Sequence, residues 1–275
     1  MRSPIPIYGG KTYMIKHLLK LIPAHATYVE VFGGTAKFLF AKDVSPVEVY
    51  NDIDSNLANF FHVLREDDLF EEFYKLCIST PYSREVFVEC RDTAETDLVK
   101  RAWRFFVVAK MAFSGRYKCP GWSKCTTRSR RNMCSTVSGW ISSIEGLPEV
   151  HSRLFRVLIE NRDFRKVIEE NDTPNTFFYL DPPYVQSARK GTNKYSFEMG
   201  DKDHKDLVES LLKIEGKAIL SGYDNNIYKK LEENKWTRRD YEATSSAIPS
   251  ITQKDNRRTE CLWFNFSPED EPRQS

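Results

Sequence analysis

Four consecutive residues, Asp181-Pro182-Pro183-Tyr184, carry groups suited to the chemistry of an aromatic amine. They follow the apolar run 176–180, whose composition is typical of a buried strand. Prolines cannot continue a strand, so they fix the backbone at its carboxyl end, where α/β proteins bind ligands. A carboxylate and a rigid carbonyl at that point can accept two protons of an amine, and Tyr184 offers a ring that can stack on a base.

The exocyclic amine of adenine needs such acceptors because its lone pair is delocalised into the ring. Two acceptors that bind its protons pull the nitrogen toward tetrahedral geometry and expose the lone pair to a methyl group placed in line. In duplex DNA the base must first leave the helix to reach such a site. We therefore predict that Asp181, Pro182, Pro183 and Tyr184 are catalytic residues for adenine methylation. Taken alone, the segment could also be a plain strand-end turn.

The segment 28–35 indicates a strand that runs into a glycine turn and then a helix. Gly33 and Gly34 let a ligand approach the backbone closely, because glycine has no Cβ. Asp52 ends the next predicted strand, 19 residues after Gly33, where a carboxylate can bind ribose hydroxyls. The pyrophosphate pattern G-x-G-x-x-G is absent. The segment therefore indicates an adenosine-containing cofactor without a pyrophosphate, such as S-adenosylmethionine, although Asp52 could also form a simple Asn-Asp turn.

Basic residues are concentrated in the middle of the chain. Residues 98–144 contain ten lysines and arginines and no acidic residue, whereas the rest of the chain carries 31 basic and 39 acidic residues. The formal charge is therefore +10 in this stretch and −8 in the rest of the chain. A single-sign stretch of this length usually faces a polyanion, with a solvated surface as the alternative. We expect double-stranded DNA to bind here and at a basic loop after the Pro-Pro-Tyr segment. The candidate DNA-binding residues are Arg116, Lys118, Lys124, Arg128, Arg130, Arg131, Asn132, Arg189, Lys190 and Lys194.

Strands and helices alternate in two parts of the chain. Apolar periodicity predicts strands at 27–32, 47–52, 157–160, 176–180, 217–221, 236–243 and 260–266, and helices at 11–21, 164–169, 203–212 and 226–233. This alternation predicts an α/β fold with a Rossmann-like, doubly wound and mostly parallel sheet. Between the two parts, helices at 57–64, 69–77 and 96–112 lead into an irregular basic loop at 114–138, which indicates an inserted, mostly helical DNA-recognition domain.

The predicted elements divide the chain into domains. We expect 1–56 and 155–266 to form a discontinuous catalytic domain, 57–154 the target-recognition domain, and 267–275 a polar tail. Histidines and cysteines lack the spacing of metal ligands, so no metal is expected, and His204 is expected at the surface. No apolar stretch is long enough to span a membrane and the first residues lack a signal-peptide core, so we expect a cytoplasmic protein.

The order of these motifs resembles the Dam-like (D12 class) adenine-specific DNA methyltransferases over most of the chain. Tyr8-Gly9-Gly10-Lys11, the turn Glu30–Gly34, the basic insert and Asp181–Tyr184 follow one another as they do in that family. The resemblance implies a class I methyltransferase fold, S-adenosylmethionine as the methyl donor and no metal. It leaves a cognate restriction enzyme open as a partner.

The resemblance also implies roles for individual residues. Tyr8 and Lys11 would lie against the cofactor, with Glu30, Phe32, Gly33 and Gly34 at its methionine end, Asp52 at its ribose, Asp163 and Phe164 at its adenine, and Asp181 also in contact with it. Judged from its own residues alone, Asp163-Phe164 is a strand-to-helix cap. Two positions depart from the family pattern, because Val31 stands where proline is common and Thr35 where glycine is frequent. Neither change removes a charged group, so both bear on cofactor affinity more than on activity.

Two other functions are compatible with parts of this pattern. Related enzymes that methylate RNA or glutamine side chains in proteins use a similar Pro-Pro-Tyr segment, usually with asparagine in place of Asp181 and without a long basic insert. A non-catalytic DNA-binding module is the third alternative, against which Asp52 and the intact Asp181–Tyr184 argue. The aspartate and the basic insert together favour adenine in DNA.

Overall fold

The computed structural model describes residues 1–6, 13–113, 120–188, 197–244 and 257–268. These residues belong to two compact units. One unit consists of Met1–Thr12, Gly34–Asp43 and Asp54–Asn161. The other consists of Tyr13–Gly33, Val44–Ile53 and Arg162–Ser275. Seven of the predicted site residues lie outside the described residues: Tyr8, Lys11, Arg116, Lys118, Arg189, Lys190 and Lys194.

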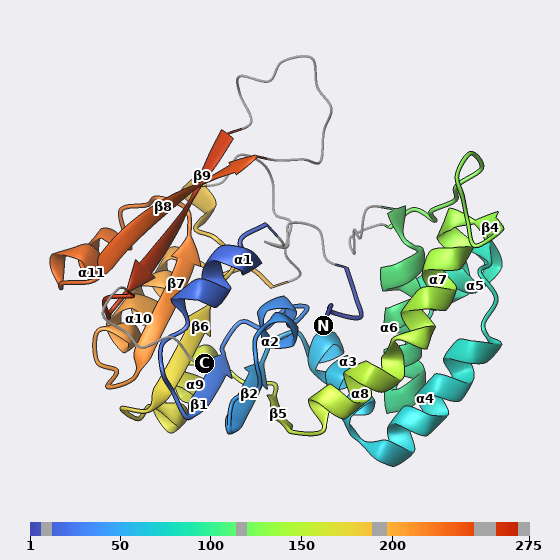
Figure 1. Cartoon of the computed structure of the whole chain (residues 1–275), viewed down its shortest axis with the longest axis horizontal. Coiled ribbons are helices and arrows are strands. Elements are labelled where there is room, and N and C mark those ends of the chain that lie inside the picture. Colours follow the sequence, from blue (N-terminus) through green and yellow to red (C-terminus); the bar gives the residue numbers. More distant parts are fainter. Residues whose placement is uncertain (7–12, 114–119, 189–196, 245–256, 269–275) are drawn as a thin grey trace. The chain divides into compact units, whose positions relative to one another are not determined.

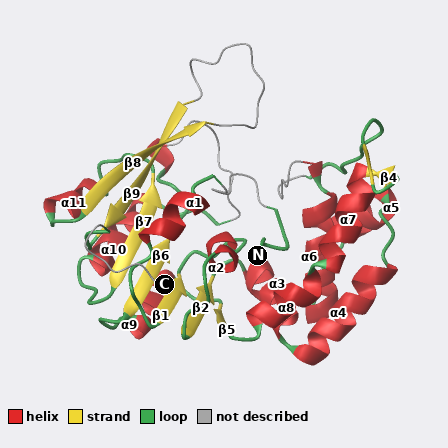
Figure 2. Ribbon diagram, viewed as in Figure 1, coloured by secondary structure: helices red, strands yellow, loops and turns green. Residues whose placement is uncertain are grey.

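A seven-stranded sheet has the order β5-β2-β1-β6-β7-β9-β8 (Figures 1 and 2). The strands are β1 (Thr27–Glu30), β2 (Val47–Asn51), β5 (Val157–Glu160), β6 (Thr176–Leu180), β7 (Lys217–Gly222), β8 (Thr237–Thr244) and β9 (Arg257–Phe264). Strand β1 runs parallel to β2 and β6, and β6 runs parallel to β7, whereas β9 is antiparallel to both β7 and β8. The predicted mixed α/β fold with a mostly parallel sheet is confirmed, and each strand begins and ends within three residues of its prediction.

Helices cover the sheet in the unit that contains β1 and β6. Helices α9 (Phe164–Asn171) and α10 (Asp201–Leu211) pack on each other, and with α11 (Lys229–Glu233) they bury apolar side chains against one face of the sheet. Successive side chains of a strand point to opposite faces, so Glu260 points away from Cys261, which belongs to this core. The phenol of Tyr13, directly before α1 (Ile15–Leu18), reaches Glu260, which places it on the opposite face.

His204 lies inside this unit, so the expectation of a surface residue is wrong. It is fully buried, because it shares the apolar face of α10 with Leu207, Val208 and Leu211 at helical spacing. Its Nδ1 lies 2.8 Å from the hydroxyl oxygen of Tyr228. The helix begins two residues before the predicted start. Its N-cap is Gly200, whose backbone N–H donates to the carboxylate of Asp203.

The other unit is mostly helical, as predicted for the insert. Its helices are α2 (Lys37–Ala41), α3 (Ser55–Arg65), α4 (Asp67–Ser79), α5 (Arg84–Asp92), α6 (Leu98–Met111), α7 (Ser135–Glu145) and α8 (Leu147–Leu154). Helix α6 packs against α3, α4, α5 and α7, around the buried rings of Phe60, Phe73, Phe106 and Trp140. Helices α5, α7 and α8 were not predicted. Part of the predicted irregular loop is a hairpin of β3 (Ser129–Arg130) and β4 (Met133–Cys134).

Two cations of the acid-free stretch lie wholly or partly inside this helical unit. Arg104 is buried and Lys110 is half-buried. The guanidinium of Arg104 donates hydrogen bonds to the carbonyl oxygens of Glu89 (3.1 Å) and Cys90 (2.9 Å) in the last turn of α5. The last carbonyls of a helix have no partner within the helix, so Arg104 caps α5 from its neighbour α6. Burial lowers the pKa of Lys110. The positive charge available to a polyanion is therefore smaller than the sequence suggests.

Replacement of Arg104 by methionine is expected to lower the free energy of unfolding by about 2 kcal/mol, because it leaves buried carbonyls without their charged donor. Urea denaturation followed by circular dichroism measures this change. Lys100→Met, at an exposed position of the same helix, is the control and is expected to leave the unfolding free energy within about 0.5 kcal/mol of the parent. Equal stability of the two variants would contradict the capping role.

Candidate active site

The sequence motifs meet at one edge of the sheet because β1 and β6 are parallel neighbours. In their register Glu30 lies opposite Tyr179, and the backbone N–H of Val31 donates to the carbonyl of Tyr179 at 3.2 Å. The turn after β1 and the segment after β6 therefore leave the sheet side by side. Strand β1 has β2 on its other side, so the strand order reverses at this point, where α/β sheets bind ligands.

Glycine is required in the turn after β1. A Cβ atom at Gly33 would lie 2.1 Å from a ring carbon of Tyr50, a fully buried side chain of β2. The N–H of Gly33 donates to the carbonyl of Asn51 at 2.7 Å, which ties the turn to the end of β2. Gly34 has a φ of +50°, a conformation that side chains with a Cβ rarely adopt. Gly33 is thus required by the close approach of the Tyr50 ring and Gly34 by its backbone conformation.

Asn51 joins the predicted cofactor segments and was missed by the sequence analysis. Its amide nitrogen donates to the carbonyls of Val31 (2.9 Å) and Arg162 (3.1 Å), and its amide oxygen accepts from the N–H of Arg162 at 2.9 Å. These bonds hold the turn after β1 and the segment before Asp163 against the end of β2. Asn51 is 2% exposed and directly precedes Asp52, which is half-buried. In the sequence, the polar residue Asn51 next to Asp52, at the end of a predicted strand, was the feature that could have indicated this role.

Asp163 is the N-cap of α9, as its own residues predicted. Its carboxylate accepts from the N–H of Arg165 at 2.9 Å and pairs with the Arg165 guanidinium at 2.8 Å. The same guanidinium pairs with Asp203 and Asp206 of α10, both at 2.7 Å. Arg165 therefore fixes the orientation of Asp163 and links α9 to α10.

The aromatic rings predicted to lie near the cofactor are in contact. The rings of Phe32 and Phe164 are 5.5 Å apart, and the Arg165 guanidinium lies 4.4 Å above the Phe164 ring. Phe32 is half-buried and Phe164 is buried. This pair brings together the turn after β1 and the start of α9, two segments that the sequence separates by more than 100 residues.

Carboxylates gather around Tyr179, two residues before Asp181. Burial raises the pKa of Tyr179, and nearby Asp181, Glu30 and Glu260 raise it further in that order. Glu30 and Glu260 are buried and Asp181 is half-buried. Each buried carboxylate accepts from a phenol, because Tyr28 donates to Glu30 at 2.8 Å and Tyr184 donates to Glu260 at 2.8 Å. The result is a negatively charged site suited to a cationic ligand.

The segment Asp181–Tyr184 leaves β6 directly at this site. Pro182 and Tyr184 are buried, and Pro183 is half-buried. The Tyr184 ring meets the Tyr223 ring edge-on, with centroids 4.4 Å apart and an interplanar angle of 72°. The carboxylate of Asp181 and the aromatic ring of Tyr184 therefore belong to one rigid connection at the carboxyl end of a buried strand.

A comparison with known families identifies the family of the chain. Residues 8–245 match the model of the D12 class N6 adenine-specific DNA methyltransferases. The chain belongs to this family. None of the curated protein sequences matches the chain.

Membership in the D12 class makes the protein an enzyme that methylates the N6 amine of adenine in DNA. Its seven-stranded, mostly parallel sheet is consistent with the class I methyltransferase fold that the sequence predicted. The family match supersedes the alternatives of an RNA or glutamine methyltransferase and of a non-catalytic DNA-binding module.

Several of the predicted DNA-binding residues of this DNA methyltransferase lie in or before the β3–β4 hairpin. Arg130 belongs to β3, Arg128 directly precedes it, and Lys124 comes earlier in the chain; all three are exposed. The residues between β3 and β4, Arg131 and Asn132, have φ angles of 56° and 57°, as in the type I′ turns that connect two-residue hairpins. The guanidinium of Arg131 pairs with both carboxylate oxygens of Glu145 on α7 at 2.9 Å, so this side chain is already bound within the protein.

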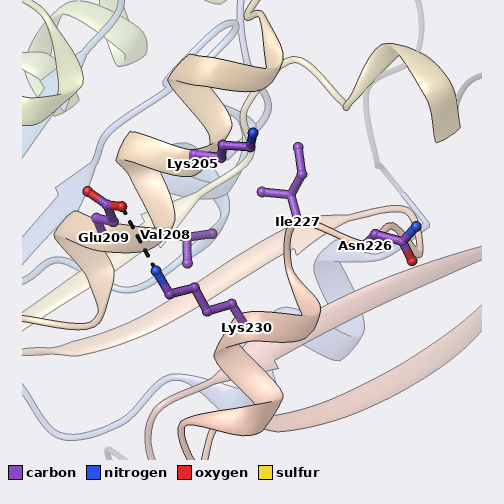
Figure 3. Close-up of a pocket in the computed structure, with 6 residues that line it drawn as sticks. All are labelled: Lys205, Val208, Glu209, Asn226, Ile227 and Lys230. Carbon is purple, nitrogen blue, oxygen red and sulfur yellow. Dashed lines mark ion pairs between the residues drawn. The ribbon is translucent and has the colours of Figure 1, made fainter.

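A cavity of about 410 Å³ lies elsewhere in the methyltransferase, between α10 and the start of α11 (Figure 3). It is lined by Lys205, Val208, Glu209, Asn226, Ile227 and Lys230. Lys230 and Glu209 form a long ion pair of 3.9 Å across it. None of the motif residues lines this cavity, and we assign it no role in the reaction.

Two features are absent from the part of the chain that the structure describes. No group of three or more His, Cys, Asp and Glu side chains in that part is arranged to hold a metal ion. No helix in it is long and apolar enough to cross a membrane.

Asn51→Ala is expected to weaken binding of S-adenosylmethionine about tenfold, which corresponds to a loss of about 1.4 kcal/mol. The physical reason is that Val31 and Arg162 lose their shared partner, so the two segments that are predicted to bind the cofactor are no longer held together. Isothermal titration calorimetry measures the affinity, and urea denaturation measures the accompanying loss of stability. Asn226→Ala, at an exposed asparagine of the same unit, is the control. Parental affinity in Asn51→Ala would contradict a positioning role for Asn51.

Proposed function

We propose that this methyltransferase is site-specific and transfers the methyl group of S-adenosylmethionine to adenine N6 in duplex DNA after the base has flipped out of the helix. Membership in the family supports the methylation of adenine N6 in DNA. The roles of individual residues are supported by the parallel pairing of β1 with β6, which brings the Glu30–Gly33 turn next to Asp181. Cofactor and target residues thus share one edge of the sheet, at the strand-order reversal where α/β proteins bind ligands.

The donor set at this edge fits S-adenosylmethionine. When bound, this cofactor supplies an electrophilic methyl group on a positively charged sulfonium. Glu30, Asp181 and Glu260 around Tyr179 favour a positive charge, and at Gly34 no atom lies within 4 Å of the position that a Cβ would take. We assign Glu30, Phe32, Gly33 and Gly34 to the methionine end, Asp52 to the ribose, and Asp163 and Phe164 to the adenine, with Asp181 also in contact. Tyr8 and Lys11 carry the roles that the family resemblance implies.

Asp163 has the capacity to bind the adenine of the cofactor while it caps α9. An ionised carboxylate offers about four acceptor sites, and the bonds from Arg165 use one on each oxygen. Its side chain is exposed, so a ligand amine can approach it. The Phe32–Phe164 pair next to it supplies an aromatic surface for the purine ring.

For catalysis, the carboxylate of Asp181 and a backbone carbonyl of the Asp181–Pro183 segment accept the two protons of the target amine. These bonds localise the nitrogen lone pair and orient it, so the protein contributes positioning and electrostatics without a covalent intermediate. The proton released from the methylated nitrogen passes to Asp181 or to water. Tyr184 stacks on the flipped base, and because its ring is buried, neighbouring residues move aside when the base enters.

We assign residues 57–154 to target recognition, 1–56 with 155–266 to catalysis, and 267–275 to a polar tail. A two-stranded ribbon fits the major groove of DNA, and the β3–β4 hairpin presents Arg128 and Arg130 next to an asparagine at its turn. We assign DNA contacts to Lys124, Arg128 and Arg130, which are exposed. Arg131 is held by Glu145, whereas Asn132 is suited to bind the edge of an adenine. The candidates Arg116, Lys118, Arg189, Lys190 and Lys194 keep the same assignment on sequence grounds.

The proposed function is tested by incubation of the protein with labelled S-adenosylmethionine and duplex DNA, RNA or protein, followed by digestion and identification of the labelled product. Label is expected in N6-methyladenine from DNA. Asp181→Ala is expected to lower the turnover number at least about a thousandfold, because the amine loses its charged acceptor, while calorimetry still detects cofactor binding. Undiminished turnover in Asp181→Ala would refute the assigned role.

Methylation-sensitive sequencing of DNA from cells that express the enzyme determines the target sequence. We expect methylated adenines to fall within one short recognition sequence. Methylation without any common sequence would contradict site specificity. A cognate restriction enzyme, where one exists, would cut the same sequence only when it is unmethylated.

Arg130→Ala is expected to weaken DNA binding and to reduce the slope of log K against log salt by about one, because one phosphate contact is lost. Fluorescence anisotropy of labelled duplex DNA at several salt concentrations measures both quantities. Lys75→Ala removes the same charge from an exposed position of α4 and is the control. An unchanged affinity and salt slope in Arg130→Ala would exclude this residue from the interface.

A further inference from the structure

Strand β9 contains one buried carboxylate among apolar residues. Glu260 is 5% exposed, and Cys261, Leu262, Trp263 and Phe264 after it are buried as well. A buried carboxylate destabilises a fold unless hydrogen bonds replace its hydration. An apolar side chain at this position would therefore stabilise the sheet at least as well. The function of Glu260 is indicated by the hydrogen bonds that it makes.

Two phenols bind Glu260, one on each oxygen. The Tyr184 hydroxyl donates to Oε2 at 2.8 Å, and the Tyr13 hydroxyl donates to Oε1 at 3.0 Å. Hydrogen bonds to an ionised acceptor are stronger than those between neutral groups. Because Tyr13 occupies the second oxygen, it opposes rotation of the carboxylate, and Oε2 keeps a defined position for Tyr184.

Tyr184 is thereby restrained at its hydroxyl end as well as along its ring. Glu260 holds the hydroxyl, Tyr223 contacts the ring edge-on at 4.4 Å, and Pro183 precedes it in the chain. A ring held in this way has lost its rotational freedom before a substrate arrives, so stacking on a base costs less conformational entropy.

We propose that Glu260 is a positioning residue for the methyl transfer: it acts through the Tyr184 hydroxyl and holds the aromatic ring in the orientation that receives the target adenine. This inference rests on the proposed function of Tyr184 as the stacking partner of the flipped base. Tyr13 supports the same carboxylate and belongs to the same network. The side chain of Glu260 does not touch the reacting atoms in this assignment.

Glu260→Gln tests the inference because it preserves the shape of the side chain. The amide offers one acceptor oxygen and a nitrogen that only donates, so it cannot accept from both phenols. We expect the turnover number to fall about tenfold, as for loss of one charge-assisted hydrogen bond. The dissociation constant of S-adenosylmethionine is expected to rise by less than the turnover number falls, because Glu30 and Asp181, the other two carboxylates around Tyr179, keep their charge.

Tyr184→Phe and the double variant Glu260→Gln/Tyr184→Phe complete a double-mutant cycle with Glu260→Gln. Tyr184→Phe keeps the ring and removes the hydroxyl, so we expect a similar loss of turnover. The double variant should lose little more than either single variant, since both interrupt the same interaction. Glu242→Gln makes the same chemical change at an exposed position of the neighbouring strand β8, and it is expected to retain parental turnover.

A spectroscopic readout separates positioning from general damage to the fold. With 2-aminopurine in place of the target adenine, at the site found by sequencing, stacking quenches the emission of the flipped base. Glu260→Gln and Tyr184→Phe are expected to raise this emission at saturating DNA, whereas Glu242→Gln is not. A merely structural role for Glu260 would lower the stability without this increase.

Several outcomes would overturn the inference: parental turnover in Glu260→Gln, full additivity in the double variant, or unchanged emission. Should Glu260→Gln fail to fold, Tyr184→Phe decides, because parental turnover in that variant excludes action through the hydroxyl. A parent protein that forms no N6-methyladenine refutes the proposed function itself. An active parent with undiminished variants refutes only the role of Glu260.

Discussion

The parallel pairing of β1 with β6 is the constraint on which the active site depends. The chain separates Glu30 from Asp181 by about 150 residues, yet the register of the two strands places Glu30 opposite Tyr179. Both strands end at the same edge, so the turn that needs glycine and the segment that needs proline leave the sheet together. A change of register by one residue would turn the side chains of one strand to the opposite face and separate the carboxylates.

Around this edge, polar side chains do the positioning. Asn51 holds the turn after β1 and the segment before Asp163, the half-buried Arg165 orients Asp163, and Glu260 binds Tyr184. Asn51 and Glu260 are buried, which is unfavourable unless their hydrogen bonds are made. Because these bonds join segments that are distant in the sequence, the site keeps its geometry only when the whole sheet is assembled.

The basic stretch has two physical roles that composition does not separate. Arg104 is buried among helices, where it caps α5, and Lys110 is half-buried. Arg130 of β3 and Arg128, directly before it, are exposed, so their charge is available to a phosphate backbone. The same residue types thus stabilise the helical unit or provide its charged surface, according to whether their side chains are buried or exposed.

The sequence by itself determined the sheet, the family and most of the chemical groups. Period-two and apolar runs predicted all seven strands, and Gly33, Asp52 and Asp181 stood out because each lies at or after the end of a predicted strand, where α/β sheets bind ligands. Only the tertiary structure decided that Asn51, Arg165 and Glu260 support them and that His204 is buried. These roles depend on hydrogen bonds between segments far apart in the chain, and local periodicity carries no information about such partners.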